Sequence, residues 1–344
     1  MTSRQFFVLA IAFSCSSALT LGQAPAGGQA TGRAGGAQPP QPLTETTAPA
    51  IPGVIAAGTK ITPIRDGFQG TEGPITLPDG SLIFTEAAAN RITKIDKDNN
   101  VSVFLENTNG SNSLAFDSQG RLIAVQTTPG STRVGVIYPQ NAVRTFTDSF
   151  EGKPYLRPND LVVTRSGGVY FTDMGGGGRG AAAGAAPPLP NSVYYVPPTG
   201  PVIRVVEGVA RPNGIQLSRD ERTLYLNDAG GEYLFAFDVA PDGRLTNKRN
   251  FAKYEGVPPA NAQGVINSQA DGLAIDAEGR VYAAMPNGVQ VFSPEGKPLG
   301  TIPTSRRVQN LAFAGADKKT LYMVGSGAAF KTQMLATGFK DRVK

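Results

Sequence analysis

The feature that most constrains the fold of this chain is a pair of short apolar segments that occurs six times. In each copy, a turn rich in Asp, Gly, Ser or charged residues separates the two segments, and the copies recur about every 40 to 60 residues. Dipeptides such as Asp79-Gly80 supply the positive φ angles that a tight hairpin needs. The pattern therefore predicts six β-hairpins. The copies begin at Glu72, Ser111, Arg157, Arg211, Ala270 and Val308.

Six hairpin repeats over roughly 280 residues, with no convincing amphipathic helix between them, predict an all-β fold. A single linear sheet of that many strands is unfavourable, and an open stack would leave strand edges exposed. We therefore predict a six-bladed β-propeller with about four antiparallel strands in each blade. The segment ahead of the first repeat, including Ile61 to Ile64, is expected to add a strand that closes the ring against the last blade.

The composition excludes several kinds of catalytic site. The 344 residues include no histidine and one cysteine. A Ser-His-Asp or Cys-His nucleophile system, a His-ligated zinc site and an intramolecular disulfide are therefore impossible. The net charge of +5 comes from scattered Lys and Arg without a basic run, so we predict no nucleic-acid partner. Any chemistry must use carboxylates, amides, hydroxyls, Arg, Lys, Tyr or a metal bound by oxygen.

The N-terminal segment has the layout of a signal peptide. Arg4 precedes an apolar run from Phe6 to Phe13 and then small residues, and this run is too short to span a bilayer. We predict a signal peptide over residues 1–22, and hence a periplasmic or secreted protein without a membrane span. A lipoprotein acylated at Cys15 is the second interpretation, because the residues before Cys15 match that signal poorly.

Two stretches of biased composition are expected to lack regular structure. Residues 23–52 consist mostly of Ala, Gly, Gln, Pro and Thr, which predicts a flexible linker ahead of a propeller domain at residues 53–344. Residues 175–190 indicate a mobile, Gly/Ala-rich loop inserted in that domain. The four consecutive glycines in this loop lack the strand-Gly-Lys-helix context of a phosphate-binding loop.

One position of the repeat carries a side-chain oxygen in all six copies, just before the first strand. The first strand of a propeller blade is normally the innermost, so these positions should point toward one mouth of the central channel. Two carboxylates there would balance a divalent ion, and asparagine side chains would add neutral oxygens. We predict a metal site on this basis. The six residues are Glu72, Asn112, Asn159, Asn213, Asp271 and Gln309.

Asn and Asp are also common turn residues, and we favour that interpretation for Asn112 and Gln309. Asp173 and Asp228 each follow a second strand, so they are expected to act as turn or capping residues. The predicted metal ligands are therefore the remaining four residues of the set: Glu72, Asn159, Asn213 and Asp271.

An ordered series of motifs resembles the SMP-30/gluconolactonase (regucalcin-like) family, over nearly everything from about Ile61 to the C-terminus. The chain departs from the family pattern at Ser111-Asn112-Ser113, at residues 125–130, at Ala314 and in the loop after Asp173, which alters the expected walls of the substrate pocket. The matching motifs are Glu72-Gly73-Pro74, Pro158-Asn159-Asp160, Phe171-Thr172-Asp173, Pro212-Asn213-Gly214, Asp271-Gly272-Leu273 and LAFAGADKKTLY from Leu311.

The resemblance implies one divalent metal at the four predicted ligands, calcium first, with Zn²⁺, Mn²⁺, Mg²⁺ or Fe²⁺ as alternatives. It also suggests Arg157 and Asn159 as substrate contacts and Asp271 as the aspartate that acts on water. The expected activity is hydrolysis of a small-molecule sugar lactone to its aldonic acid. The alternatives are a non-catalytic scaffold propeller and a propeller hydrolase of other esters or phosphotriesters. The oligomeric state stays open, with a monomer slightly favoured.

Overall fold

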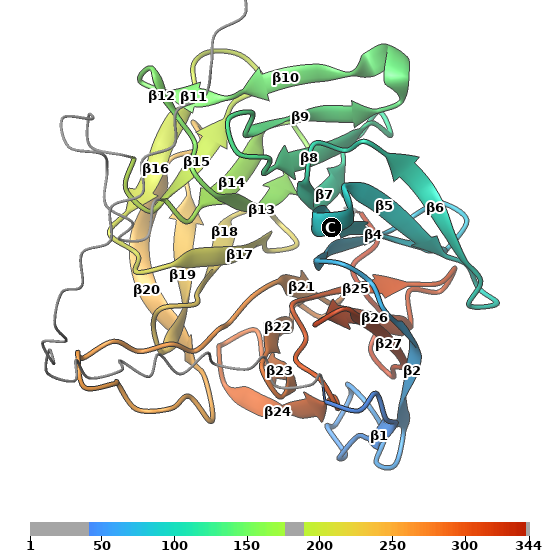
Figure 1. Ribbon diagram of the computed structural model, residues 1–344. Helices are drawn as coiled ribbons and strands as arrows, with labels where there is room; N and C mark the ends of the chain where they lie inside the picture. The colour runs from blue at the N-terminus through green and yellow to red at the C-terminus, as the bar shows by residue number, and fades with distance from the viewer. Residues whose placement is uncertain (1–40, 176–188, 342–344) are drawn as a thin grey trace, which may run out of the picture. The chain divides into compact units, whose positions relative to one another are not determined.

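In the described part of the chain, six antiparallel sheets of four or five strands are arranged around a central axis, which confirms the predicted six-bladed propeller (Figure 1). The computed structural model describes residues 41–175 and 189–341. The predicted signal peptide with Cys15, and most of the insertion at 175–190, lie outside these residues. Within the described ranges, no helix has the length and apolar character needed to cross a bilayer.

Each blade is a meander in which strands follow one another from the axis outward. Blade one contains β3 (Thr71–Thr76), β4 (Leu82–Glu86), β5 (Arg91–Ile95) and β6 (Val101–Glu106). Blade two contains β7 (Ser111–Phe116), β8 (Leu122–Gln126), β9 (Arg133–Tyr138) and β10 (Arg144–Thr147). Blade three contains β13 (Pro158–Val163), β14 (Val169–Asp173), β15 (Ser192–Val196) and β16 (Ile203–Glu207).

The second half of the chain repeats this order. Blade four contains β17 (Pro212–Leu217), β18 (Thr223–Asp228), β19 (Tyr233–Val239) and β20 (Leu245–Lys253). Blade five contains β21 (Leu273–Ile275), β22 (Val281–Met285), β23 (Gly288–Phe292) and β24 (Pro298–Pro303). Blade six contains β25 (Asn310–Ala314), β26 (Thr320–Gly325), β27 (Ala328–Gln333), β2 (Lys60–Asp66) and β1 (Thr46–Thr47). The remaining elements are a hairpin, β11 (Ser149–Phe150) and β12 (Lys153–Pro154), and two 3₁₀ helices, η1 (Ala87–Ala89) and η2 (Gln140–Ala142).

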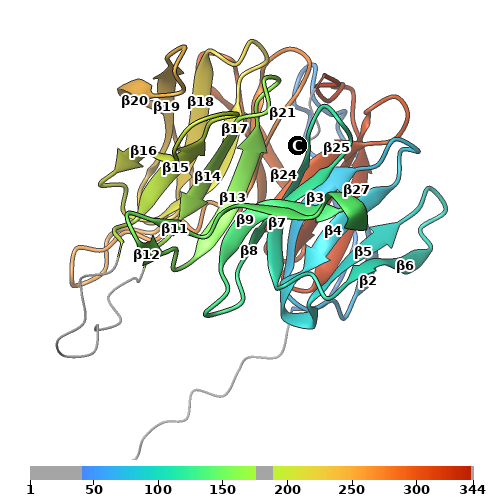
Figure 2. The same cartoon turned by 90° about the horizontal axis from the view of Figure 1, so that it is seen from above.

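The innermost strands form a closed ring. Each of β3, β7, β13, β17, β21 and β25 contacts the next, and β25 contacts β3. The blades lie face to face around the axis, as the view turned by 90° shows (Figure 2). Apolar side chains on these faces form the core, for example Ile75, Ile83 and Leu114 between blades one and two. Alternation along each strand supplies these apolar faces, because successive side chains point to opposite sides of a sheet.

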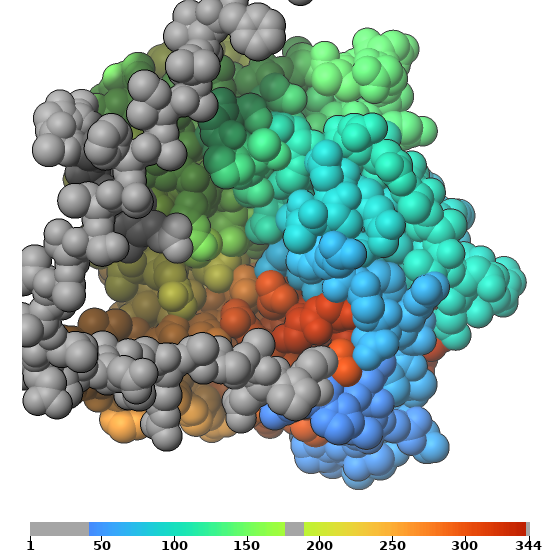
Figure 3. All heavy atoms as spheres, in the orientation of Figure 1, coloured from blue at the N-terminus to red at the C-terminus, as the bar shows by residue number. Residues whose placement is uncertain are grey.

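The ring is closed by a strand from the N-terminal side, as the sequence predicts. β2 pairs with β27 in blade six, with Ile61 opposite Thr332. The blue N-terminal segment accordingly lies against the orange and red C-terminal blades (Figure 3). Joining the two ends of the chain in one sheet removes an exposed strand edge.

Residues 41–52 belong to the folded part, which corrects the predicted boundary between linker and propeller at residue 52. β1 pairs with β2, with Thr46 opposite Ile61. Ile51 is 1% exposed, and Leu43 packs against the same apolar cluster. A polar composition averaged over residues 23–52 concealed these few apolar side chains, which are enough to anchor the segment to blade six.

Four inner strands carry the same irregularity, one extra residue relative to the neighbouring strand. It follows the position that the sequence singled out in β3, between Glu72 and Ile75, and it includes that position in β7, β13 and β17. A bulge of this kind bends the strand and re-aims its side chains. In four blades, this bulge therefore turns the side chain at this position toward the channel mouth.

Candidate active site

The backbone at the singled-out positions is held by the preceding blade. In five of the six positions, the main-chain carbonyl accepts a hydrogen bond across the blade interface. These bonds run from Thr85 Oγ1 to Asn112 (2.7 Å), from Asn112 Nδ2 to Asn159 (2.9 Å), from Thr172 Oγ1 to Asn213 (2.9 Å), from Asn227 Nδ2 to Asp271, and from the Gly272 N–H to Gln309 (2.8 Å).

The residue that follows each position contacts the next blade, which explains the glycines of the motifs. A Cβ on Gly214 would overlap the carbonyl oxygen of Asp271, so only glycine fits there. In blades two and three the following residues are polar and form a chain instead. Ser113 Oγ donates to Asp160 Oδ1 at 2.5 Å, and Asp160 Oδ2 accepts from the Ile215 N–H at 2.9 Å.

Glu72 of β3 is buried at the channel mouth, with 6% of its surface exposed. Its carboxylate accepts hydrogen bonds from three neutral groups: Gln309 Nε2 at 3.2 Å, Asn310 Nδ2 at 3.1 Å and the Gly73 N–H at 3.3 Å. Gln309, for which a turn role was predicted, thus contacts a predicted metal ligand. Because the two amides come from blade six, these bonds close the ring of inter-blade contacts.

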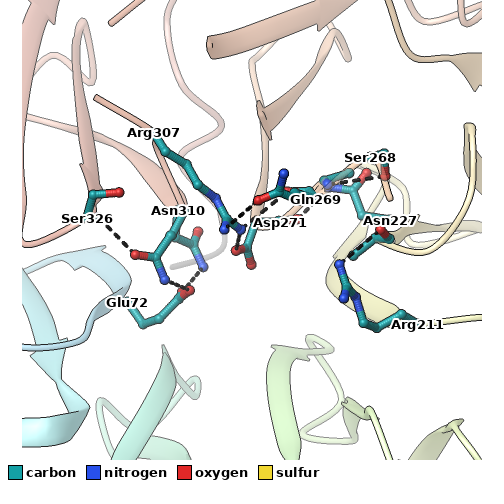
Figure 4. Close-up of polar contacts among 12 residues, drawn as sticks. Glu72, Arg211, Asn227, Ser268, Gln269, Asp271, Arg307, Asn310 and Ser326 are labelled. Atoms are coloured by element: carbon teal, nitrogen blue, oxygen red, sulfur yellow. Dashed lines mark hydrogen bonds and ion pairs between the residues drawn. The ribbon is translucent and has the colours of Figure 1, made fainter. Parts of the chain in front are cut away.

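Asp271 precedes β21 and is 4% exposed. Burial raises its pKa well above the usual range, and the nearby negative charge of Glu72 raises it further. The guanidinium of Arg307 opposes these effects, with Nη2 at 3.1 Å from Asp271 Oδ2, and a hydrogen bond from Asn213 acts in the same direction. Figure 4 shows Arg307 reaching toward Asp271, with Glu72 and Asn310 alongside. The site thus holds two buried carboxylates, and Glu72 lies close enough to Asp271 to disfavour the ionised form of Asp271.

Asn213 of β17 provides a further oxygen atom. Its Oδ1 is buried and has no hydrogen-bond partner among the described residues. An unsatisfied buried acceptor is costly unless a ligand meets it. Two mutually repelling carboxylates beside this oxygen fit a hard divalent cation, which takes carboxylate and amide oxygens. No group of three or more His, Cys, Asp or Glu side chains suited to a metal occurs in the described ranges, so such a site needs amide ligands.

Asn159 and Arg157 lie at the start of blade three, and their roles as metal ligand and substrate contacts stay predictions. Asn159, the second residue of β13, is half-buried, and none of the contacts given by the described residues joins its side chain to Glu72 or Asp271. Arg157 is exposed, and its backbone N–H donates to Asp173 Oδ1 at 2.7 Å. Among the ion pairs of the described residues, none joins Arg157 to the nearby carboxylate of Glu151. The charge of the Arg157 guanidinium acts on Asp173, whose pKa it lowers.

Asp173 and Asp228 act on the backbone, as predicted. Asp173 accepts N–H groups of Leu156, Arg157 and Gly175, and Asp228 accepts N–H groups of two further residues, Arg211 and Gly230. Burial raises the pKa of Asp173, and these N–H donors and the Arg157 guanidinium partly offset that increase. Both carboxylates therefore fix the loops from which inner strands start.

Arg307 is the functional residue that the sequence interpretation missed. It contacts Gln269 as well as Asp271, and its Nε is buried without a partner in the described part of the chain. The sequence did contain an indication of this residue, because an arginine lies two residues before the singled-out position in three blades. These arginines are Arg157, Arg211 and Arg307.

Fold and site together define a class: six-bladed propellers with a buried carboxylate and amide cluster at one channel mouth. Within that class, residues 70–327 match the SMP-30/gluconolactonase/LRE-like region, and the chain belongs to this family. The motifs that carry the match supply the clustered side chains of Glu72, Asn213 and Asp271.

Known relatives cover most of the chain. It is 29% identical to a gluconolactonase of Zymomonas mobilis over 301 residues, which are 81% of this chain and 82% of the relative. It is 27% identical to a regucalcin of Xenopus laevis over 258 residues, which are 72% of this chain and 80% of that protein. The solved structure of a gluconolactonase from Xanthomonas campestris matches with a TM-score of 0.71 at 26% identity, over 86% of this chain and 97% of that one.

Proposed function

We propose that this protein is an exported, metal-dependent lactonase that hydrolyses a sugar lactone to its aldonic acid. The observation that carries the proposal is the cluster of Glu72, Asp271 and the unpartnered Oδ1 of Asn213. Similarity to gluconolactonases over most of their length supports lactone hydrolysis as the reaction. The signal-peptide layout of residues 1–22 supports export.

The proposed metal ligands are Glu72, Asn213 and Asp271, with Asn159 as the fourth. All four offer oxygen, the donor that calcium prefers, and the two carboxylates match a charge of +2. A divalent cation bound there would act as a Lewis acid on the lactone carbonyl. Its charge would also relieve the repulsion between the two carboxylates that raises the pKa of Asp271.

The remaining chemistry falls to side chains of this chain. Asp271 would orient the attacking water and accept its proton, because its carboxylate lies beside the proposed metal and is held there by contacts with Arg307 and Asn213. Arg307 holds the Asp271 carboxylate in one orientation through its 3.1 Å contact. Arg157 and Asn159 are proposed to position sugar hydroxyls. A strained lactone hydrolyses readily, so the site needs no strong protein nucleophile.

The test is a lactone panel that includes glucono-δ-lactone, assayed with chelator-treated protein and after adding back Ca²⁺, Mg²⁺, Mn²⁺, Zn²⁺ or Fe²⁺ singly. We expect turnover to fall on chelation and to return with Ca²⁺. If turnover returned only with another ion, the proposed metal would change, but the proposed reaction would stand. Hydrolysis that persists unchanged in the chelated protein would refute metal dependence, and absence of turnover with every lactone and ion would favour the scaffold.

A further inference from the structure

A cavity lies at the end of the propeller opposite to the candidate active site. Its volume is about 630 Å³, and it is lined by the turns that join the first and second strands of blades six, one and two. The candidate active site lies at the starts of the inner strands, whereas these turns follow their ends. Inner strands of about six residues separate the two by about 20 Å, since a strand rises about 3.3 Å per residue.

One side of this cavity is apolar. Leu77, Phe104 and Phe116 are half-buried against the apolar cluster between blades one and two. The ring of Tyr138, which is 40% exposed, packs on Phe104 with centroids 5.3 Å apart. These side chains line the cavity and leave apolar surface open to a ligand.

Leu77 is exceptional for its place in the repeat. The residue that begins the turn after the inner strand is polar in blades two to five, where its side chain accepts a backbone N–H of the same turn. In blade one that position is apolar and lines the cavity instead. The equivalent polar residues are Asp117, Thr164, Ser218 and Asp276.

Lys318 is the one basic residue among the described residues that line the cavity. Its Nζ lies 3.4 Å from the carbonyl oxygen of Phe313, and it forms no ion pair with any acidic side chain of the described residues. Burial, with a smaller contribution from the charge of Lys340, lowers its pKa to about 8. Asp117 also lines the cavity, but its Oδ2 is engaged by Arg121 at 2.6 Å. The positive charge of Lys318 is therefore poorly compensated, and an anion would stabilise it.

We propose that this cavity binds a small amphipathic carboxylate, with its aromatic or aliphatic body on the apolar wall and its carboxylate at Lys318 Nζ. A cavity of this size, with a mostly apolar lining, one basic side chain without an ion-pair partner among the described residues and one carboxylate already paired with Arg121, matches the general character of small-molecule sites. The single uncompensated amine selects a monoanion over a neutral molecule of the same shape. The site is separate from the channel mouth and does not depend on the proposed lactonase activity.

Isothermal titration calorimetry on the full chain with 4-phenylbutyrate and 4-phenylbutan-1-ol tests the proposal. The two probes share an apolar body and differ in charge. We expect saturable binding of the acid, at least about tenfold tighter than that of the alcohol, because a charge-assisted hydrogen bond is added. Lys318→Met should remove this preference. Lys319→Met, which makes the same charge change at the next residue, outside the cavity lining, should retain it.

Two further variants show where the probes bind. Tyr138→Ser removes part of the wall at an exposed position and should weaken both probes severalfold, and Asp271→Asn should leave both affinities unchanged. The proposal is overturned by equal affinity of acid and alcohol for the unmodified protein, or by absence of saturable binding of either. A preference that survives Lys318→Met, or acid binding lost in Asp271→Asn, overturns it as well.

Discussion

At the scale of single residues, the proposed chemistry depends most on Asp271. Asp271→Asn keeps the shape of the side chain but removes a negative charge and a proton acceptor. We expect kcat for glucono-δ-lactone to fall at least about 100-fold, the usual minimum loss when a general base is removed. Metal affinity should fall too. Asp238→Asn, on the exposed surface of β19 beside Arg249, is the matched control. Unchanged kcat in Asp271→Asn would remove this residue from the mechanism.

Also at the scale of single residues, substitution of Arg157 distinguishes the proposed enzyme from a non-catalytic scaffold. Arg157 is exposed and lies two residues before Asn159 in the sequence. A positive charge close to the proposed metal ligands cannot help to bind a cation. We expect Arg157→Ala to raise KM or to lower kcat for a sugar lactone several-fold, with metal affinity equal or higher. Steady-state kinetics and metal titration measure both. If only the thermal stability changes, this arginine is structural.

The two arginines illustrate how far sequence reasoning reaches. Radial symmetry converts one position of the repeat into one place in space, so Glu72, Asn213 and Asp271 could be located from the sequence. The direction in which a long side chain points cannot be predicted from the repeat. Arg307 contacts Asp271, whereas Arg211 donates a hydrogen bond to Asn267 Oδ1 at 2.6 Å. Which partner each arginine contacts depends on the neighbouring loops.

At the scale of elements, Glu86 fixes the end of β4. Burial would raise its pKa, but donors from Arg91, Thr93 and the Gln69 N–H outweigh burial and hold the pKa below its usual value. A depressed pKa in the folded state means stability that is present above the unfolded-state value of 4.5 and is lost as the pH falls through the folded value.

Glu86→Gln should therefore lower the free energy of unfolding at pH 7 by about 2 kcal/mol, the scale of buried charge-assisted hydrogen bonds. Denaturant unfolding of both proteins from pH 7 to pH 3 checks this. We expect the difference between them to shrink below about pH 4.5. A difference that stays constant over that range would mean that the lost packing, not the carboxylate charge, accounts for the change.

The N-terminal element β1 gives a second prediction at this scale. Deleting residues 41–50 removes its pairing with β2, the packing of Leu43 and the bond from Thr46 Oγ1 to the Pro303 carbonyl at 2.6 Å. We expect a loss of about 2 kcal/mol and a melting temperature lower by several degrees, relative to a chain that starts at Gln41. Equal melting temperatures would show that β1 adds no stability, as the composition of the segment had suggested.

At the scale of the whole molecule, the propeller converts local repeats into one cooperative ring. The number of blades and the closing strand could be predicted, because hairpins recur along the chain and Ile61 to Ile64 is apolar. The cavity at the opposite end could not be predicted, because it arises where side chains from three blades meet. Leu77, Tyr138 and Lys318 lie on three different blades, and only the closed ring brings them together.

The same ring predicts that metal binding stabilises the whole fold. The proposed ligands come from blades one, three, four and five, so a bound cation would link strands that lie far apart in the sequence. A ligand that binds only the folded state adds about 2.7 kcal/mol at 100 times its Kd, so the chelated protein should melt several degrees higher after Ca²⁺ is added. Glu72→Gln should abolish most of that increase, whereas Glu207→Gln, an exposed change of equal charge beside Arg204, should preserve it. Differential scanning calorimetry measures each shift. An equal increase in Glu72→Gln would place the stabilising cation away from the channel mouth and remove the support that this cluster gives to the proposed metal site.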